Sequence, residues 1–308
     1  MIKKKFAKPA LSIDDQLQKM IARGLIVEDI ATAKHRIENI GYYRLVGYSL
    51  PFQNGGTGLD RHHFIEGVRF ETILDRYIFD RKLRLLILDA IERVEVSVRA
   101  SLSNAIALKH SPHWYRESSL FEPLFDHAGL IHEIRRQIGH DASTAERMSR
   151  QDIFIRHYYD NYYDPEMPPS WMIFESISFG TISRLFEGLY KSETTEICLP
   201  YRVTHEILSS WLHSISYIRN LCAHHSRVWN KTLTIKPVIA NKHKTSFNGN
   251  SKIYAALVVL QIMLGKIAPD NSWAERLGKL LDEHPEIPLG NMGFPLNWRS
   301  LPAWGDSL

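Results

Sequence analysis

The 308-residue chain has little cysteine, no long hydrophobic run and only a small excess of charge of one sign. Its two cysteines, Cys198 and Cys222, are too few for a disulfide scaffold and indicate a reducing compartment. The longest apolar run, "IYAALVVLQIMLG" at 253–265, is too short to span a bilayer and predicts a buried helix. No apolar segment follows the basic start "MIKKKFAKPALSIDDQ", so we expect no signal peptide. We therefore expect a cytoplasmic protein that does not enter a membrane.

The charge balance places few limits on function. The 38 basic and 34 acidic residues leave a formal net charge of +4. A surplus this small is compatible with binding a polyanion but does not require it. Hydrophobic residues make up 44% of the chain and charged residues 23%, which is typical of a folded protein and excludes a disordered one.

Helical periodicity dominates the chain, and we predict an all-α protein. Ser12 and Asp15 form a capping-box pattern at the start of a first helix, and Gly24 ends that helix. Asp29 can cap a second helix that ends near Gly41. These two helices predict a small helical subdomain at the N-terminus.

The rest of the chain predicts a larger helical body. A long helix, continuous or broken once, is expected over 71–109. Shorter helices are expected at 126–139, 149–160, 171–191, 203–225 and 251–266. Residues 231–250 have the only strand-like pattern and favour a β-hairpin or an ordered loop. With the glycine-rich loop "QNGGTGLD" as a boundary, we predict an N-terminal helical subdomain at 1–60, a helical core at 61–268, and a C-terminal helix with an irregular, wrapping tail at 269–308.

The stretch "YIRNLCAHHSRVWN", residues 217–230, is the part of the chain densest in groups that move protons or bind phosphate. A helix over this region has an apolar stripe that predicts a buried face: Val203, Ile207, Leu208, Trp211, Leu212, Ile215 and Ile218. Its other side has a polar stripe at steps of four, three, four and three: His213, Tyr217, Asn220, His224 and Arg227. Arg219 lies about a quarter turn from Asn220, and its long side chain can swing toward the polar stripe.

These residue types suit the cleavage of an RNA phosphodiester. The reaction needs a base for the 2′-OH proton, an acid for the leaving oxygen, and positive charge on the phosphorane. A histidine can take either proton role near neutral pH, and an arginine offers a fork of donors to the phosphate oxygens. Asn220 can fix the tautomer of His224 or donate to phosphate. One helix supplies one such set, so two copies facing each other in a homodimer would complete an acid–base pair.

Three other interpretations compete with this one. The polar stripe can be a satisfied structural network at a helix end. A metal site would need His213, Cys222, His224 and His225, but Cys222 lies off the stripe and no Cys-x-x-Cys or His-Glu-x-x-His pair supports it. A Ser–His hydrolase lacks its Gly-x-Ser-x-Gly turn. We predict neither a metal nor a cofactor.

The same residues carry a resemblance to a known family. "RNLCAHH" is similar to the Arg-x-x-x-x-His signature of the HEPN (higher eukaryotes and prokaryotes nucleotide-binding) ribonucleases, with Asn after the Arg. The longer "RNLCAHHSRVWN" resembles the Abi-like family of bacterial abortive-infection proteins, of the AbiD/AbiF type. Other blocks of that family are resembled in the same order: "KPALSIDDQ", "RGLIVED", "IGYYRLVGYSLPF", "FDRKLRLLILDAIERVEVSVRASL", "PPSWMIFESISFGTISRLFEGL" and "MGFPLNW".

The resemblance implies an all-helical HEPN core, usually dimeric, in phage defence or toxin–antitoxin settings. It implies metal-independent endoribonuclease chemistry by Arg219 and His224, with Asn220 in the polar position after the arginine. His225 is a rival for the histidine role, because the broader pattern also accepts it. Arg227, Trp229 and Asn230 match the extended block as supporting or RNA-binding residues. Some HEPN proteins bind small RNAs without cutting them, so a non-cleaving complex with a small antitoxin RNA is the alternative, followed by a subunit that only binds proteins.

Two further groups have competing readings. Glu92, Glu95 and Arg99 fall at steps of three and four on the long predicted helix, where they can brace Arg219 or form a solvent-facing pair. The aromatic–basic group Tyr42, Tyr43, Arg44 and Tyr48 can stack bases or pack in a core.

Overall fold

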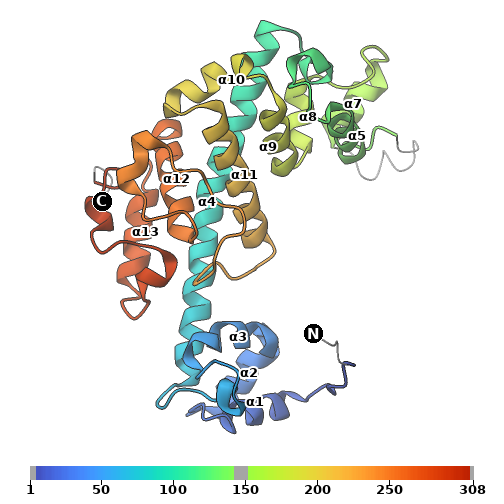
Figure 1. Ribbon diagram of the computed structural model, residues 1–308. Helices are drawn as coiled ribbons and strands as arrows, with labels where there is room; N and C mark the ends of the chain where they lie inside the picture. Colours follow the sequence, from blue (N-terminus) through green and yellow to red (C-terminus); the bar gives the residue numbers. More distant parts are fainter. Residues whose placement is uncertain (1–4, 142–151, 306–308) are drawn as a thin grey trace. The chain divides into compact units, whose positions relative to one another are not determined.

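The computed structural model describes residues 5–141 and 152–305, and its regular elements are helices (Figure 1). Within these ranges there is no β-strand, and β-type pairing is limited to isolated bridges such as Ile26 with Arg69. The predicted all-α class is therefore confirmed. The chain forms two compact units, Met1–Lys82 and Leu83–Leu308. The predicted division at residues 60 and 268 stays a prediction.

The first unit is a group of short helices with side-chain caps. Its elements are α1 (Ile13–Ile21), α2 (Ile30–Ile40), α3 (Tyr42–Ser49), η1 (Leu50–Phe52), η2 (Leu59–His62) and the start of α4 (Phe70–Lys109). The Ser12 hydroxyl accepts a hydrogen bond from the Asp15 amide at 3.1 Å, and the Asp29 carboxylate accepts one from Thr32 at 2.9 Å. Gly41 ends α2 with φ +94, a conformation that favours glycine. The caps expected at Ser12, Asp29 and Gly41 are confirmed.

The aromatic–basic group predicted around Tyr42 belongs to α3 and divides between core and surface. Tyr48 is buried, and its hydroxyl donates to the Asp80 carboxylate at 2.6 Å. Tyr43 is 90% exposed. Tyr48 therefore serves the core of the first unit, and only Tyr43 presents an open ring.

Helix α4 is continuous over 40 residues, without the break that the sequence allowed. From Leu83 onward it belongs to the second unit and buries one side of its surface there. The buried residues recur at steps of three and four: Ile87, Ile91, Val94, Val98, Leu102 and Ile106. Glu95 and Arg99 lie on this part of α4, so their position is fixed by a long run of core contacts.

The other elements of the second unit are mostly short helices. They are η3 (Trp114–Arg116), η4 (Ser118–Leu120), α5 (His127–Gln137), α7 (Ile153–Asn161), α8 (Ser170–Ser176), α9 (Phe179–Gly188), α10 (Lys191–Cys198), η5 (Leu199–Tyr201), α11 (His205–Ala223), η6 (Asn241–Ser246), α12 (Ile253–Ile267), α13 (Trp273–Asp282), η7 (Leu289–Met292) and η8 (Trp298–Ser300). None of the described helices combines the length and the apolar composition of a membrane-spanning segment.

Helix α11 is held on several sides. It packs against α9, α10 and α12, and Figure 1 shows it between α9 and α12. The predicted apolar stripe is confirmed from Leu208 onward, since the structure buries Leu208, Trp211, Leu212, Ile215 and Ile218. The other side of the helix is left for polar residues.

Several predicted helices have different bounds in the structure. The helix expected at 171–191 is divided into α8 and α9, because Ile177 is extended and the Ser178 hydroxyl caps α9 by accepting from the Thr181 amide at 3.2 Å. The helix expected at 203–225 ends at Ala223. The first residues of the helix expected at 149–160 lie outside the described residues, and α7 begins at Ile153.

Residues 231–250 form an ordered loop with η6 inside it and contain no β-hairpin. The backbone of Val238 bonds to side chains of α11, since its amide donates to the Ser210 hydroxyl and its carbonyl accepts from the Trp211 indole, both at 2.9 Å. The Ser214 hydroxyl donates to the Ile235 carbonyl at 3.4 Å. These bonds to a helix take the place of the strand pairing that the pattern suggested.

The C-terminal segment contains α13 followed by irregular structure with buried tryptophans, as expected. Trp298 and Trp304 are buried, and the Trp304 indole donates to the Tyr254 hydroxyl at 3.2 Å. Trp273 at the start of α13 stacks on Trp304 and donates to the Leu86 carbonyl of α4. The tail is therefore part of the core of the second unit.

Leu212 tests whether α11 depends on its buried face. Leu212→Ala should lower the free energy of unfolding by about 2–5 kcal/mol, because the leucine is fully buried and its loss leaves a cavity. Leu108→Ala makes the same chemical change on α4 at a side chain that is 90% exposed, and should change it by less than about 0.5 kcal/mol. Chemical denaturation measures both. Equal losses would show that α11 is not anchored as described.

Candidate active site

The C-terminal end of α11 has a Schellman motif built on two histidines. His224 is the C-cap, and His225 follows with φ +56 in the left-handed region. The His225 amide donates to the Cys222 carbonyl at 3.0 Å, and the Ser226 amide donates to the Leu221 carbonyl at 2.8 Å. Glycine is the usual residue at the position of His225, because a β-carbon is disfavoured there.

This helix end shortens the predicted polar stripe. His213, Asn220 and His224 are exposed on the side of α11 away from the core, and Tyr217 is half-buried among them. Arg227 was expected on the same helical face but lies past the turn at His225, so helical spacing does not place it there. The structure therefore brings four of the five stripe residues to one surface.

Arg219 reaches both the stripe and α4. Its Nη1 lies 3.5 Å from the side-chain oxygen of Asn220, and its Nε lies 4.0 Å from Oε2 of Glu95. The Arg219 side chain is 42% exposed, so donors of its guanidinium stay open to solvent. The predicted swing toward Asn220 is present in the structure.

The Glu95 carboxylate is shared by two arginines. Its Oε1 is ion-paired with Nη2 of Arg99, one turn further along α4, while its Oε2 faces Arg219. The side chains of Glu95 and Arg99 are only 17% and 9% exposed. Nη1 of Arg99 is buried and has no hydrogen-bond partner among the residues that the structure describes. Glu95 is thus the main counter-charge of the buried Arg99 guanidinium. The ion pair with Arg99 fixes the Glu95 carboxylate in the position where it faces Arg219.

The residues after the turn fold back into the protein. Val228 and Trp229 are buried, with Trp229 only 1% exposed. A ring buried to this extent offers no face to a nucleotide, so Trp229 supports the turn and does not stack on RNA in this conformation. Asn230 has φ +49, a conformation that asparagine tolerates better than most residues. Arg227 is half-buried between these anchored segments.

The proposed metal set is not assembled. Cys222 is 1% exposed and points into the core, whereas His213, His224 and His225 are exposed. Among residues 5–141 and 152–305 there is no group of three or more His, Cys, Asp or Glu side chains placed to hold a metal ion.

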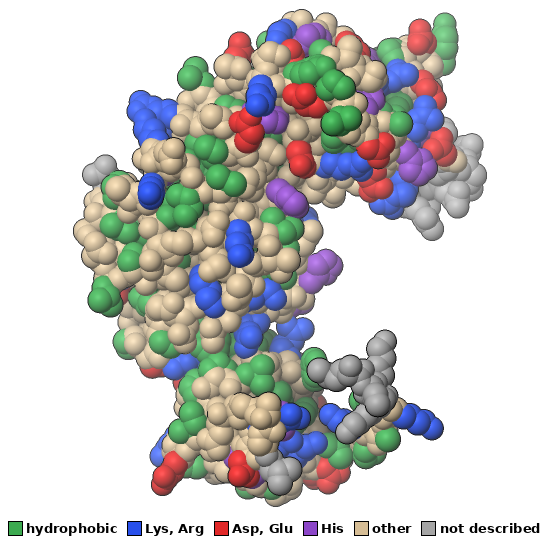
Figure 2. Space-filling view, in the orientation of Figure 1, with side chains coloured by type: hydrophobic (Ala, Val, Ile, Leu, Met, Phe, Trp, Pro, Cys, Tyr) green, Lys and Arg blue, Asp and Glu red, His purple; other side chains and the backbone are tan. Residues whose placement is uncertain are grey.

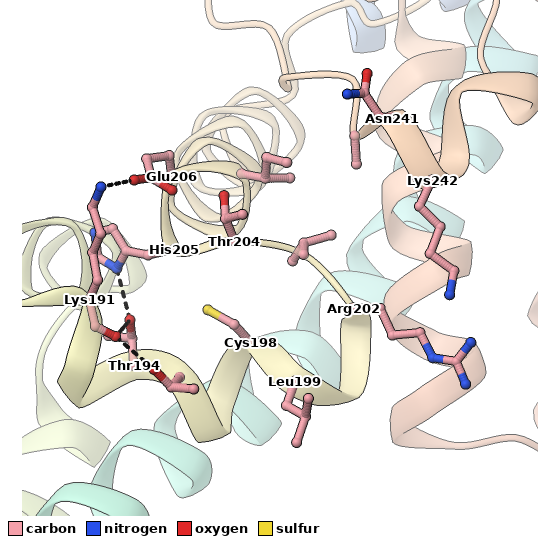
Figure 3. A pocket seen from close by; sticks show the side chains of 14 residues that line it. Lys191, Thr194, Cys198, Leu199, Arg202, Thr204, His205, Glu206, Asn241 and Lys242 are labelled. Atoms are coloured by element: carbon pink, nitrogen blue, oxygen red, sulfur yellow. Dashed lines mark hydrogen bonds and ion pairs between the residues drawn. The ribbon is translucent and has the colours of Figure 1, made fainter.

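A second feature, at the other end of α11, was missed from the sequence. A cavity of about 770 Å³ lies between α10, η5, the start of α11 and η6 (Figure 3). Arg202 and Lys242 line one side of it, and the ion pair of Lys191 with Glu206 lies on the other. Burial raises the pKa of the Cys198 thiol in this cavity to about 11, so the thiol stays protonated near neutral pH and is a weak nucleophile. The left-handed conformation of Arg202, at φ +54, has no clear sequence signal.

Residues 35–230 match the family model described as Abi-like protein, and since this segment is well over half of the chain, the protein belongs to the Abi-like family. The matched segment includes Glu95, Arg99 and the end of α11 through Asn230. No curated protein and no solved structure matches the chain.

Glu95 should matter more for stability than its neighbour on the same helix. Glu95→Gln removes the counter-charge of a buried arginine and should lower the free energy of unfolding by about 2 kcal/mol or more. Glu92→Gln makes the same change at an exposed site one turn earlier and should stay within about 0.5 kcal/mol. Urea denaturation at neutral pH compares them. If the Glu95 variant is as stable as the Glu92 variant, Glu95 does not hold the arginines.

The two histidines at the helix end should respond oppositely to glycine. His225→Gly relieves a left-handed residue and should leave the free energy of unfolding unchanged or raise it by up to about 1 kcal/mol. His224→Gly, at φ −86, should lower it by about 0.5–1 kcal/mol because glycine adds backbone entropy to the unfolded chain. Thermal or urea unfolding measures both changes. If His225→Gly clearly lowers the free energy of unfolding, the backbone of His225 is not strained in the left-handed conformation.

Proposed function

We propose that this member of the Abi-like family is an endoribonuclease that acts in phage defence by abortive infection or as a toxin. Its reacting groups are Arg219, Asn220 and His224. The observation that carries the proposal is that Asn220, exposed one turn before the exposed imidazole of His224, contacts the partly exposed guanidinium of Arg219. Glu95 faces the same guanidinium from α4.

The chemistry follows from these groups. His224 takes the proton of the ribose 2′-OH, and the freed oxygen attacks the adjacent phosphorus. The bond from phosphorus to O5′ then breaks, leaving a 2′,3′-cyclic phosphate and a 5′-OH end. A second imidazole donates the proton that the leaving oxygen needs. We assign it to His224 of a second copy in a homodimer, because a single α11 carries one such set.

Arg219 offsets the partial negative charge at the C-terminal end of α11, which would otherwise repel a phosphate. The C-terminal end of a helix carries partial negative charge, which repels a phosphate. The Schellman bonds satisfy two of the last carbonyls of α11, and Arg219 supplies a positive charge within the last five residues of the helix. Arg219 can therefore bind the non-bridging oxygens and stabilise the charge that develops on the phosphorane.

Asn220 and Glu95 position these groups. Asn220 is exposed, lies one turn before His224 and meets Arg219 through its side-chain oxygen, so its amide NH₂ faces away from that contact and is available to phosphate. Glu95 is a positioning residue, because it touches Arg219 from the interior side and not from the exposed surface.

The test is loss of RNA cleavage without loss of fold. Arg219→Ala and His224→Ala should each reduce cleavage of a mixed RNA pool by about 100-fold or more, the usual contribution of general acid–base or charge-stabilising groups. The protein is incubated with EDTA, and the ends of the products are mapped for 2′,3′-cyclic phosphate. The same variants should also lose the ability to arrest growth when expressed.

Matched controls are available on other surfaces of the same unit. His132→Ala and Arg136→Ala, both at exposed positions of α5, remove the same side-chain types and should cut RNA like the parent. His225→Gly separates the two histidines, since it preserves the turn and should retain cleavage if His224 is the reacting group. Parent-like cutting by Arg219→Ala or His224→Ala would overturn the mechanism. RNA that is bound but left whole by the parent would favour the non-cleaving alternative.

A further inference from the structure

The net positive charge of the protein arises from one tract that has an average number of basic residues and no acidic ones. Glu206 is the last acidic residue before Asp270, so the 63 residues 207–269 contain no Asp or Glu. An even distribution of the 34 acids would place about seven there. The tract has eight basic residues: Arg219, Arg227, Lys231, Lys236, Lys242, Lys244, Lys252 and Lys266. Outside it, 30 basic residues face all 34 acids, so the remainder of the chain has a net charge of −4.

The structure lays part of this tract along α11. We call residues 231–246 the basic loop. It leaves the C-terminal end of α11, passes Ser214 and Ser210 through the bonds of Ile235 and Val238, and reaches η5, where the His243 ring lies 3.4 Å from the Tyr201 carbonyl. The basic loop therefore runs antiparallel to α11 from Ser214 to the start of the helix at His205.

The lysines of the basic loop are not neutralised. Lys236, Lys242 and Lys244 are exposed and Lys231 is half-exposed, and within 5–141 and 152–305 none of the four has an ion pair or a side-chain hydrogen bond. Three lysines elsewhere have ion pairs: Lys34 with Asp14, Lys109 with Glu193 and Lys191 with Glu206. At the centre of Figure 2, over the lower part of α11 and the loop that follows it, basic and histidine side chains appear without acidic ones. The surface keeps positive charge that a polyanion can neutralise.

Two hollows lie along the N-terminal half of α11, from His213 to the start of the helix. The nearer one, about 410 Å³, is lined by His213 and Ser210 of α11 and by Lys236 of the basic loop. The farther one is the cavity of Figure 3, where Arg202 and Lys242 line the same side. Two acids also line these hollows. Glu187 of α9 lines the nearer one, and Glu206 of α11, which is ion-paired with Lys191 of α10, lines both.

We propose that the basic loop and the exposed side of α11 form a track for the backbone of single-stranded RNA that leads to Arg219 and His224. The track rests on the proposed function, since RNA is the substrate assigned above. Lys231, Lys236 and Lys242 contact successive parts of one phosphate backbone, with Arg202 beside Lys242 at the far end. A single row of cations along one helix matches one strand, and Tyr217 and His213 offer rings on which bases can stack.

The experiment uses the full chain and an RNA that cannot be cut. A fluorescent 2′-O-methyl RNA of about twelve nucleotides lacks the attacking hydroxyl, so fluorescence anisotropy at several salt concentrations reports binding alone. The variant K231Q/K236Q/K242Q should bind at least tenfold more weakly at low salt. The slope of log K against log salt should become shallower by about 2, because each lost phosphate contact on a single strand removes about 0.7.

The control variant is K8Q/K19Q/K279Q, which removes the same charge at three exposed lysines outside the tract. It should bind within about twofold of the parent. Thermal unfolding checks that both variants keep the fold. We expect no change, because the substituted lysines are not buried in the core. A poly-glutamate of matched charge should compete far less well than unlabelled RNA.

Each result decides the proposal. Equal weakening by both triple variants, no weakening by the first, no binding by the parent, or equal competition by poly-glutamate overturns the track. The proposed function fails separately: a parent that binds through the three lysines but leaves ordinary RNA uncut keeps the track and loses the nuclease. A parent that produces cyclic phosphate ends while the first triple variant binds normally keeps the nuclease and loses the track.

Discussion

One carboxylate ties the candidate site to the core. Glu95 has to neutralise Arg99, which is buried on α4, and the same carboxylate lies 4.0 Å from the guanidinium of Arg219 on α11. Because α4 is anchored by a run of buried residues and α11 by its packing against α9, α10 and α12, the contact joins two well-supported helices. The Nε end of the Arg219 guanidinium is thus held by Glu95 on the interior side, while other N–H groups of the guanidinium face solvent.

The C-terminal end of α11 is well hydrogen-bonded, but it places one histidine in an unfavourable backbone conformation. The two Schellman hydrogen bonds close the helix, and the buried Val228 and Trp229 fix the chain after the turn. The turn nevertheless has a histidine in a left-handed conformation where glycine is more stable. The hydrogen bonds of the turn and the buried residues after it therefore hold His225 in a conformation that its own backbone disfavours.

Local patterns predicted much of this molecule. The caps at Ser12 and Asp29 and the buried face of α11 depend on neighbours within one or two turns. The spacing of Glu95 and Arg99 left open whether they brace Arg219 or form a solvent-facing pair, because it does not say which helix packs beside them. The end of α11 was placed two residues too late, because no glycine marks the turn at His225. The division between α8 and α9 was missed because apolar spacing continues through Ile177. The path of residues 231–246 has no local signal, since its backbone bonds to side chains about 20 to 30 residues away in the sequence.

Those long-range bonds have a mechanical consequence. The segment that carries the unpaired lysines is fastened to Ser210, Trp211 and Ser214, which belong to the same helix as Arg219 and His224. A displacement of α11 would carry the lysines with it, so the distance between these lysines and the end of α11 is preserved. In the proposed nuclease, the length of RNA between the bound phosphates and the cleaved bond would then be set by a single helix.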